Sequence, residues 1–315
     1  MDMQKATYGE DTNHTDIATS YSSIGSAYHS LGDHEQALEY YTKALDMQKA
    51  TSKKDTNHID IAKTYRNIGS VHHLLGGYGR ALEYYTKAMD MQKATYGEDT
   101  NHTDIATSYS NIGSAYHSLG DHGQALEYYT KALDMQKATS EKDTNHIDIA
   151  KTYRNIGSVH HLVGGYGQAL ENYTKSLNMQ KATYGEDTNH VDIAKTYRNI
   201  GSVHHFLGDY RQALECYTKA FDMQKVIYGE NTNNNDIATS YSSIGSAYHS
   251  LGDHGQALEY YTKTLDMQKA TSGEDTNHID IAKTYRNIGS VHHLLGDYGQ
   301  ALEYYTKSLD MQKVI

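Results

Sequence analysis

The chain contains twenty histidines and one cysteine, the residue types most often used to bind metals or to act as nucleophiles. Adjacent pairs such as His72-His73 and His160-His161 would point about 100° apart on a helix, so the two rings of a pair cannot bind one metal ion. The sequence has no His-x-x-x-His spacing and no cysteine cluster. Cys216 has no dedicated base and is expected to be inert. We therefore expect no metal site and no cofactor.

No sequence motif of a catalytic site is present. Serine is abundant, but it recurs at repeated helical positions, and the chain lacks the Gly-x-Ser-x-Gly elbow, the phosphate-binding loop and the Gly-x-Gly-x-x-Gly motif. The acidic Tyr-Gly-Glu-Asp and Asp-Thr-Asn segments lack the full spacing of a calcium loop. The chain is therefore predicted not to be an enzyme.

A group of basic and polar residues recurs at helical spacing. Lys63, Arg66, Ser70 and His73 follow the positions i, i+3, i+7 and i+10, so they would share one side of a helix, with Asn67 at its edge. Arginine can hold a carboxylate through two hydrogen bonds, and asparagine can satisfy the backbone of a bound peptide. Such a surface would suit an extended peptide with acidic residues.

These residues are positioned by a 44-residue unit that repeats seven times without an insertion or a deletion. The segment His14-Thr15-Asp16-Ile17-Ala18 returns, with small changes, at positions 58, 102, 146, 190, 234 and 278. A fixed period of this size predicts stacked repeats, each of which buries its apolar face only against its neighbours. We expect a partial repeat end at 1–13, followed by units 14–57, 58–101, 102–145, 146–189, 190–233, 234–277 and 278–315.

Each unit predicts two helices. The apolar or small side chains between residues 16 and 30 follow the spacing i, i+3, i+4, i+7, and those between residues 37 and 45 form a second stripe. Gly32 suits a left-handed helix end, and Asp33 offers a cap for the next helix. Small residues such as Gly25 would let the two helices approach closely. The unit is therefore predicted to be an antiparallel helix pair.

This pattern resembles the tetratricopeptide repeat. Tyr21 stands at the usual tryptophan position, Tyr41 at the usual phenylalanine position, and Lys49 where that family usually has proline. The long period and the long second helix are similar to the kinesin-light-chain and nephrocystin-type subclass. The resemblance implies an all-α, right-handed superhelix of seven antiparallel helix pairs that binds proteins or peptides. The positions that carry it are Tyr21, Ile24, Gly25, Tyr28, Leu31, Gly32, Ala37, Tyr41 and Ala44.

By this resemblance, the basic side of the first helices lines the concave groove of the superhelix. The basic version occurs in repeats 2, 4, 5 and 7, so repeats 4 and 5 are the only adjacent basic pair. An acidic peptide is expected to prefer them, with Leu162 and Phe206 as apolar anchors and His161 and His205 adding charge below about pH 6.5. The alternative is a solvated face that drifted and was then copied by duplication. The candidate residues are Lys63, Arg66, Asn67, Lys151, Arg154, Asn155, His161, Lys195, Arg198, Asn199, His205, Phe206, Lys283, Arg286 and Asn287.

Composition limits the classes of partner and the location. The net charge of −11 disfavours bulk attraction to nucleic acid or to an anionic membrane. The N-terminus has no apolar stretch of a signal peptide, and no segment approaches the roughly 20 apolar residues of a membrane span. A single cysteine excludes an internal disulfide and fits a reducing compartment. A cytoplasmic location is therefore expected.

Two main functions are consistent with these features. One is a non-enzymatic scaffold or adaptor that binds an extended, acidic peptide. The other is the sensor or partner-recruiting region of a larger signalling protein or enzyme whose effector domain lies outside this chain. Neither end shows a polar cap, which favours the second function and also suggests self-association through uncapped ends. A third interpretation is an array that was expanded by duplication and mainly supplies reach or self-association.

Overall fold

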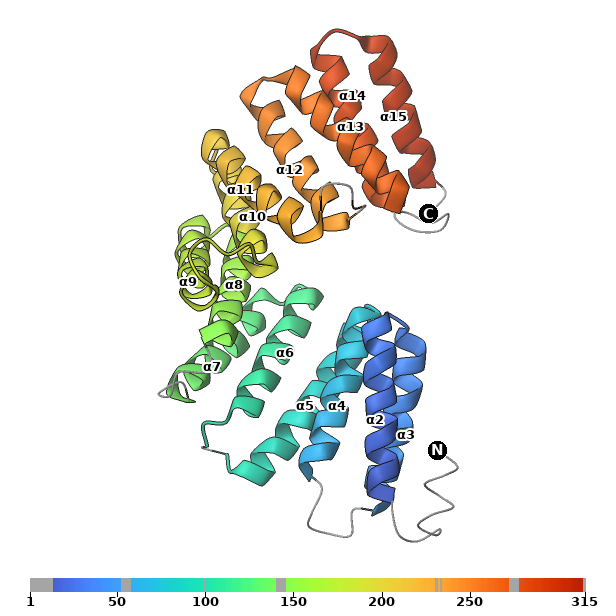
Figure 1. Ribbon diagram of the computed structural model, residues 1–315, viewed down its shortest axis with the longest axis vertical. Coiled ribbons are helices and arrows are strands. Elements are labelled where there is room, and N and C mark those ends of the chain that lie inside the picture. Colours follow the sequence, from blue (N-terminus) through green and yellow to red (C-terminus); the bar gives the residue numbers. More distant parts are fainter. Residues whose placement is uncertain are drawn as a thin grey trace. The chain divides into compact units, whose positions relative to one another are not determined.

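The structure, a computed structural model, describes residues 14–51, 58–98, 100–139, 146–229, 232, 234–271 and 278–313. All regular secondary structure in these ranges is helical, and its fourteen helices form seven pairs (Figure 1). We call the first helix of each pair helix A and the second helix B. The prediction of an all-α array of helix pairs is confirmed. The pairs are α2 (His14–Leu31) with α3 (His34–Thr51), α4 (His58–Leu74) with α5 (Tyr78–Tyr96), α6 (Thr103–Leu119) with α7 (His122–Thr139), α8 (His146–Leu162) with α9 (Tyr166–Tyr184), α10 (Val191–Phe206) with α11 (Tyr210–Tyr228), α12 (Asn235–Leu251) with α13 (His254–Thr271), and α14 (His278–Leu294) with α15 (Tyr298–Lys313).

The chain divides into two compact units, Met1–Val159 and His160–Ile315. The division falls inside α8. The first unit therefore holds repeats 1 to 3 and most of helix A of repeat 4, and the second unit holds the remainder. The repeat boundaries and the right-handed path of the superhelix remain predictions.

The turn between helix A and helix B is built as the sequence predicts. Gly32 has a φ of 81° and Gly120 a φ of 82°, in the left-handed region that favours glycine. The carboxylate of Asp33 then accepts a hydrogen bond from the backbone N–H of Gln36 at 3.1 Å, which caps α3. Because each turn is only a few residues long, the two helices must lie antiparallel, side by side.

The glycine inside helix A lies where it faces helix B, as predicted. A Cβ atom added to Gly25 would lie 2.8 Å from Cδ1 of Tyr41, and one added to Gly201 would lie 2.8 Å from Cδ1 of Tyr217. Both distances are shorter than normal van der Waals contact. Glycine is therefore required at this position because the tyrosine ring of helix B occupies the space of a side chain.

Clusters of buried apolar side chains join neighbouring repeats. In the first unit, Tyr41 and Leu45 of α3 pack with Ile68 and Val71 of α4, which belongs to the next repeat. In the second unit, α11 and α12 form a cluster of the same kind. Helix B of one repeat therefore shares a core with helix A of the following repeat, as expected for a solenoid.

A side-chain hydrogen bond crosses five of the junctions between repeats and was not anticipated from the sequence. Ser108 Oγ of α6 donates to Gln92 Oε1 of α5 at 2.7 Å, and both side chains are buried. A buried polar pair of this kind specifies the register of a junction, because sliding one helix along the other leaves both groups without partners. The same bond joins Thr152 to Gln136, Thr196 to Gln180, Ser240 to Gln224 and Thr284 to Gln268.

We expect Ser108→Ala to lower the free energy of unfolding by about 1–3 kcal/mol, because it leaves the buried Oε1 of Gln92 without its donor. Gln92→Met combined with Ser108→Ala should cost clearly less than the sum of the two single changes, since no polar group is then left unpaired. Urea unfolding of the four proteins in a double-mutant cycle measures this coupling. Additive effects would show that the bond does not hold the junction.

Candidate functional site

Three of the predicted lysines, Lys63, Lys151 and Lys283, are exposed on helix A with a carboxylate beside them, and Lys195 is half-buried. Lys63 Nζ lies 3.8 Å from Asp60 Oδ1, and Lys151 Nζ lies 3.7 Å from Asp148 Oδ1. In each case the aspartate is three residues earlier on the same helix. Such exposed pairs contribute little energy, so both ammonium groups are accessible to a ligand.

Two of the predicted arginines are already paired with the next repeat. Arg66 Nη1 lies 3.4 Å from Asp104 Oδ1, and Arg198 Nη1 lies 3.7 Å from Asp236 Oδ1. These contacts join α4 to α6 and α10 to α12. From the sequence, both guanidinium groups were expected to be open to an acidic ligand. The structure shows instead that such a ligand must compete with a carboxylate of the protein.

The carboxylate of Asp104 belongs to a network at the start of α6. Tyr96 Oη donates to Asp104 Oδ2 at 3.0 Å, and its ring stacks on His102 with ring centroids 3.6 Å apart. His102 Nδ1 accepts a hydrogen bond from the backbone N–H of Asp104 at 3.1 Å, which caps the helix. Burial and the hydrogen bond to Asp104 raise the pKa of Tyr96. Arg66 therefore completes a structural junction.

The outward-pointing histidines also join neighbouring A helices. His73 Nε2 lies 3.1 Å from Ser118 Oγ and 3.4 Å from Ser114 Oγ. In the second unit, His205 Nε2 lies 3.1 Å from Ser250 Oγ. In both places a basic repeat precedes a neutral one. The histidine on helix A of the basic repeat therefore lies within hydrogen-bond distance of serines on helix A of the neutral repeat.

Phe206 replaces the serine where one basic repeat follows another, and an exposed aromatic patch results. The ring of Phe206 lies 5.1 Å from that of His161 and stacks on Tyr166 at 5.9 Å. The side chains of Phe206 and Leu162 are 63% and 61% exposed. Burial lowers the pKa of His161. His161 therefore becomes charged at a lower pH than an ordinary histidine. This reduces the contribution to the binding of an acidic peptide that was expected from it near pH 6.5.

A cavity of about 240 Å³ lies between α6 and α8 in the first unit. Two of its lining residues, Lys151 and Asn155, are predicted site residues, and α6 supplies Asn111 opposite them. Sequence reasoning missed Asn111 because it belongs to a neutral repeat, although it lies one repeat before Asn155. The remaining lining residues are Thr107, Ser110, Ser114, Gln136, Asp148 and Thr152.

The expected joint site of repeats 4 and 5 remains a prediction. The segment from Lys151 to Asn155 belongs to the first compact unit, whereas the segment from Lys195 to Asn199 belongs to the second. Arg286 and the lysine three residues before it lie exposed on α14. The structure therefore brings together two predicted residues within the first unit, Lys151 and Asn155, around one cavity.

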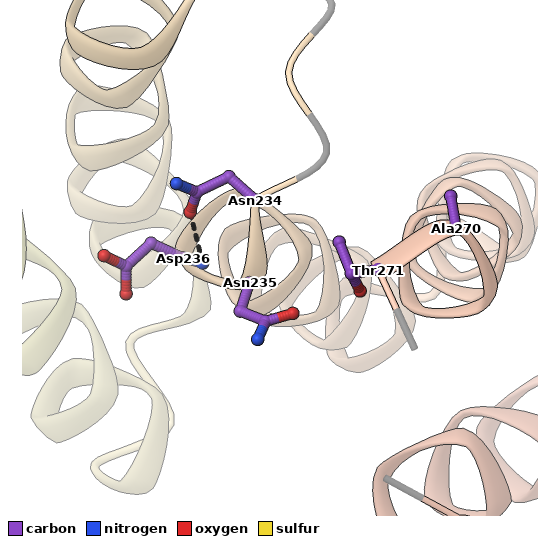
Figure 2. A pocket seen from close by; sticks show the side chains of 5 residues that line it. All are labelled: Asn234, Asn235, Asp236, Ala270 and Thr271. Atoms are coloured by element: carbon purple, nitrogen blue, oxygen red, sulfur yellow. Dashed lines mark hydrogen bonds between the residues drawn. The ribbon is translucent and has the colours of Figure 1, made fainter. Parts of the chain in front are cut away.

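A wider hollow of about 580 Å³ in the second unit has a different character. Its lining residues come from the start of α12 and the end of α13 (Figure 2). Asn234 Oδ1 accepts the backbone N–H of Asp236 at 2.7 Å, and Thr271 Oγ1 donates to the carbonyl of Met267 at 2.9 Å. These polar groups serve their own helices. Asn234 and Thr271 are therefore not free to bind a ligand in this hollow.

Within the described ranges, no group of three or more histidine, cysteine, aspartate or glutamate side chains is arranged to hold a metal ion. In those same ranges no helix is sufficiently long and apolar to cross a membrane. Cys216 is half-buried, and burial raises the pKa of its thiol, which lowers the fraction of reactive thiolate.

The sequence profile of the tetratricopeptide repeat matches residues 5–50, 60–138, 104–182, 148–226, 192–270 and 236–313. The chain belongs to the tetratricopeptide repeat family. Members of this family are generally interaction modules without catalytic activity. A search of curated proteins finds no similar sequence.

Solved tetratricopeptide structures share the fold at low sequence identity. The apo quorum sensor NprR from B. thuringiensis has a TM-score of 0.71 and 18% identity, covering 99% of this chain and 80% of NprR. A Rap protein complexed with competence and sporulation factor has a TM-score of 0.65 and 15% identity, covering 96% and 77%. The STAND protein PH0952 from Pyrococcus horikoshii, which carries a tetratricopeptide repeat sensor, has a TM-score of 0.70 and 15% identity, covering 95% and 42%. At these identities the likeness shows the fold alone.

Proposed function

We propose that this tetratricopeptide repeat chain is a non-enzymatic scaffold or adaptor that binds an extended peptide segment of another protein along its A helices. The observation that carries the proposal is the cavity between α6 and α8, which is lined by Asn111, Lys151 and Asn155. The similar Rap protein was solved with competence and sporulation factor bound, which supports a ligand-binding role for this fold.

The two asparagines supply the chemistry for holding a peptide backbone. An asparagine amide both donates and accepts hydrogen bonds, so one side chain can satisfy an N–H and a C=O of a bound peptide. Asn111 and Asn155 lie one repeat apart, on neighbouring A helices that line the same cavity. An extended chain crossing the two helices would meet both amides in turn.

Preference for an acidic peptide rests on local charge, because the net charge of −11 opposes it at long range. Lys151 lies in the cavity but has Asp148 3.7 Å away. Arg154, Lys195 and Asn199 would extend the basic surface, whereas Arg66 and Arg198 contribute less because they are paired. The proposed contributors elsewhere are Lys63, Asn67, His161, His205, Phe206, Lys283, Arg286 and Asn287.

We expect the double variant Asn111→Ser/Asn155→Ser to bind acidic peptides about tenfold more weakly than the unaltered chain, because it removes two hydrogen-bonding amides. Serine is the natural residue at this position in repeats 1 and 6, so the helices should be retained. Fluorescence anisotropy with an acidic peptide library measures the change, and Asn178→Ser, at an exposed position of α9 outside the proposed site, serves as the matched control. Affinity should also fall as salt rises. Equal binding by the double variant would contradict the proposed site.

The second candidate function is the sensor region of a larger signalling protein. It is favoured by the likeness to the STAND protein, of which this fold covers 42%. The coding sequence on either side of these residues would distinguish the two candidates. We also propose a cytoplasmic location for this chain, and self-association through the ends of the array. Sedimentation over a range of concentrations tests the self-association.

A further inference from the structure

A second surface, away from the A helices, lies in the first unit between α3 and the turn that joins α4 to α5. It is a groove of about 420 Å³, and we call its two lining leucines the base and its lining charged residues the rim. We propose that this groove docks a basic amphipathic segment of a partner protein, which inserts a large apolar side chain between the leucines and places lysine or arginine on the rim.

The base of the groove is apolar and accessible. Leu38 comes from α3 and is half-buried, and Leu75 comes from the turn after α4 and is 51% exposed. Because the two leucines come from different repeats, an apolar side chain between them would be in contact with both walls. Such contact removes apolar surface of both partners from water, which favours binding.

The rim of the groove is acidic. Glu35, Glu39 and Asp46 lie on the groove side of α3, and Lys43 is the only basic residue among the lining side chains. Lys43 Nζ lies 2.5 Å from Glu39 Oε1, so this ammonium is already paired. Three carboxylates against one ammonium leave a net negative charge, which selects a basic occupant. The chain's charge of −11 attracts the same kind of partner at long range.

Among the seven repeats, only the first has glutamate at the position of Glu35. The equivalent position is arginine in repeat 5, at Arg211. The turn groove beside it, about 290 Å³, is lined by Gly208, Asp209, Tyr210, Arg211, Gln212 and Leu251, so it holds one carboxylate and one guanidinium. A guanidinium there would repel a lysine-rich segment. Repeats 2, 3, 4, 6 and 7 have glycine, at Gly79, Gly123, Gly167, Gly255 and Gly299.

These natural differences define the test, because glycine and arginine are both compatible with the fold at this position. A fluorescent synthetic helical peptide of leucine and lysine is titrated against the full 315-residue chain and its variants. We expect Glu35→Gly to weaken binding about two- to fivefold, and Glu35→Arg about tenfold, from the loss and the reversal of one exposed charge interaction. Leu75→Ser should weaken it by a similar factor through the apolar base.

Two controls separate the groove from bulk charge. Glu98→Arg makes the same change in net charge at an exposed position in the loop after α5, and it should leave the affinity unchanged. A peptide with glutamate in place of lysine should not bind. Equal weakening by Glu98→Arg and Glu35→Arg would overturn the proposal, and so would binding that is insensitive to Leu75→Ser. Concentration-dependent dimerisation that Glu35→Arg abolishes, without peptide binding, would assign the groove to a second copy of the chain instead.

Discussion

Replacing Gly201 by leucine should destabilise the second unit by at least about 1–3 kcal/mol, the usual effect of overpacking a filled core. A Cβ at Gly201 would lie 2.8 Å from Cδ1 of Tyr217 and 3.1 Å from the carbonyl oxygen of Ala213. Tyr217 is itself buried, and burial raises its pKa to about 12. The added side chain would therefore meet a buried ring and a backbone carbonyl, and α10 must move away from α11 to accommodate it.

Thermal or urea unfolding measures this change. Gly167→Ala is the matched control, because Gly167 lies in the first turn of α9 and an added Cβ there meets nothing within 4 Å. Alanine should stabilise that helix by up to about 1 kcal/mol. A Gly201→Leu protein with an unchanged or higher melting temperature would show that helix A and helix B do not meet at this glycine.

A fragment with a single repeat should be largely unfolded, whereas a fragment with repeats 1 to 3 should be helical and cooperative. The reason is that the clusters in the core combine helix B of one repeat with helix A of the next, as Tyr41 and Ile68 do. One repeat alone leaves half of each cluster exposed to water, and isolated short helices are marginal. The chain with all seven repeats should be more stable than the fragment with three.

Circular dichroism during urea unfolding of residues 102–139, 14–139 and the full chain tests this length dependence. The midpoint should rise with the number of repeats, because each added repeat contributes one more interface. A single repeat that unfolds cooperatively, at the same midpoint as the full chain, would be incompatible with cores shared between neighbours.

The fold could be predicted because its determinants are local and recur. The period, the glycine at the end of helix A and the capping aspartate are each visible within one unit, and Gly32, Asp33 and Gly25 adopt the predicted roles. The hydrogen bonds between side chains of neighbouring repeats could not be predicted in this way. Gln92 and Ser108 each occupy an ordinary polar position on a helix, and only packing shows that both are buried.

The candidate site was predicted in part. Lys151 and Asn155 line one cavity, but Asn111 was not predicted, because it belongs to a neutral repeat that carries none of the basic residues. The pairing of Arg66 with Asp104 was also missed, since the two residues are 38 positions apart and belong to different repeats. Sequence spacing shows which residues share a face of one helix. It does not show which charges the neighbouring helix has already neutralised.

The hydrogen bond from serine or threonine to glutamine, which recurs at five junctions, has a consequence for how the array assembles. Since Gln92 and Gln224 present the same acceptor, and Ser108 and Ser240 the same donor, a refolding chain can join helices from non-adjacent repeats almost as well as the correct ones. Such mismatched intermediates must come apart before folding continues. The same interchangeability means that the gene can gain or lose whole 44-residue units while every remaining junction keeps a matching partner.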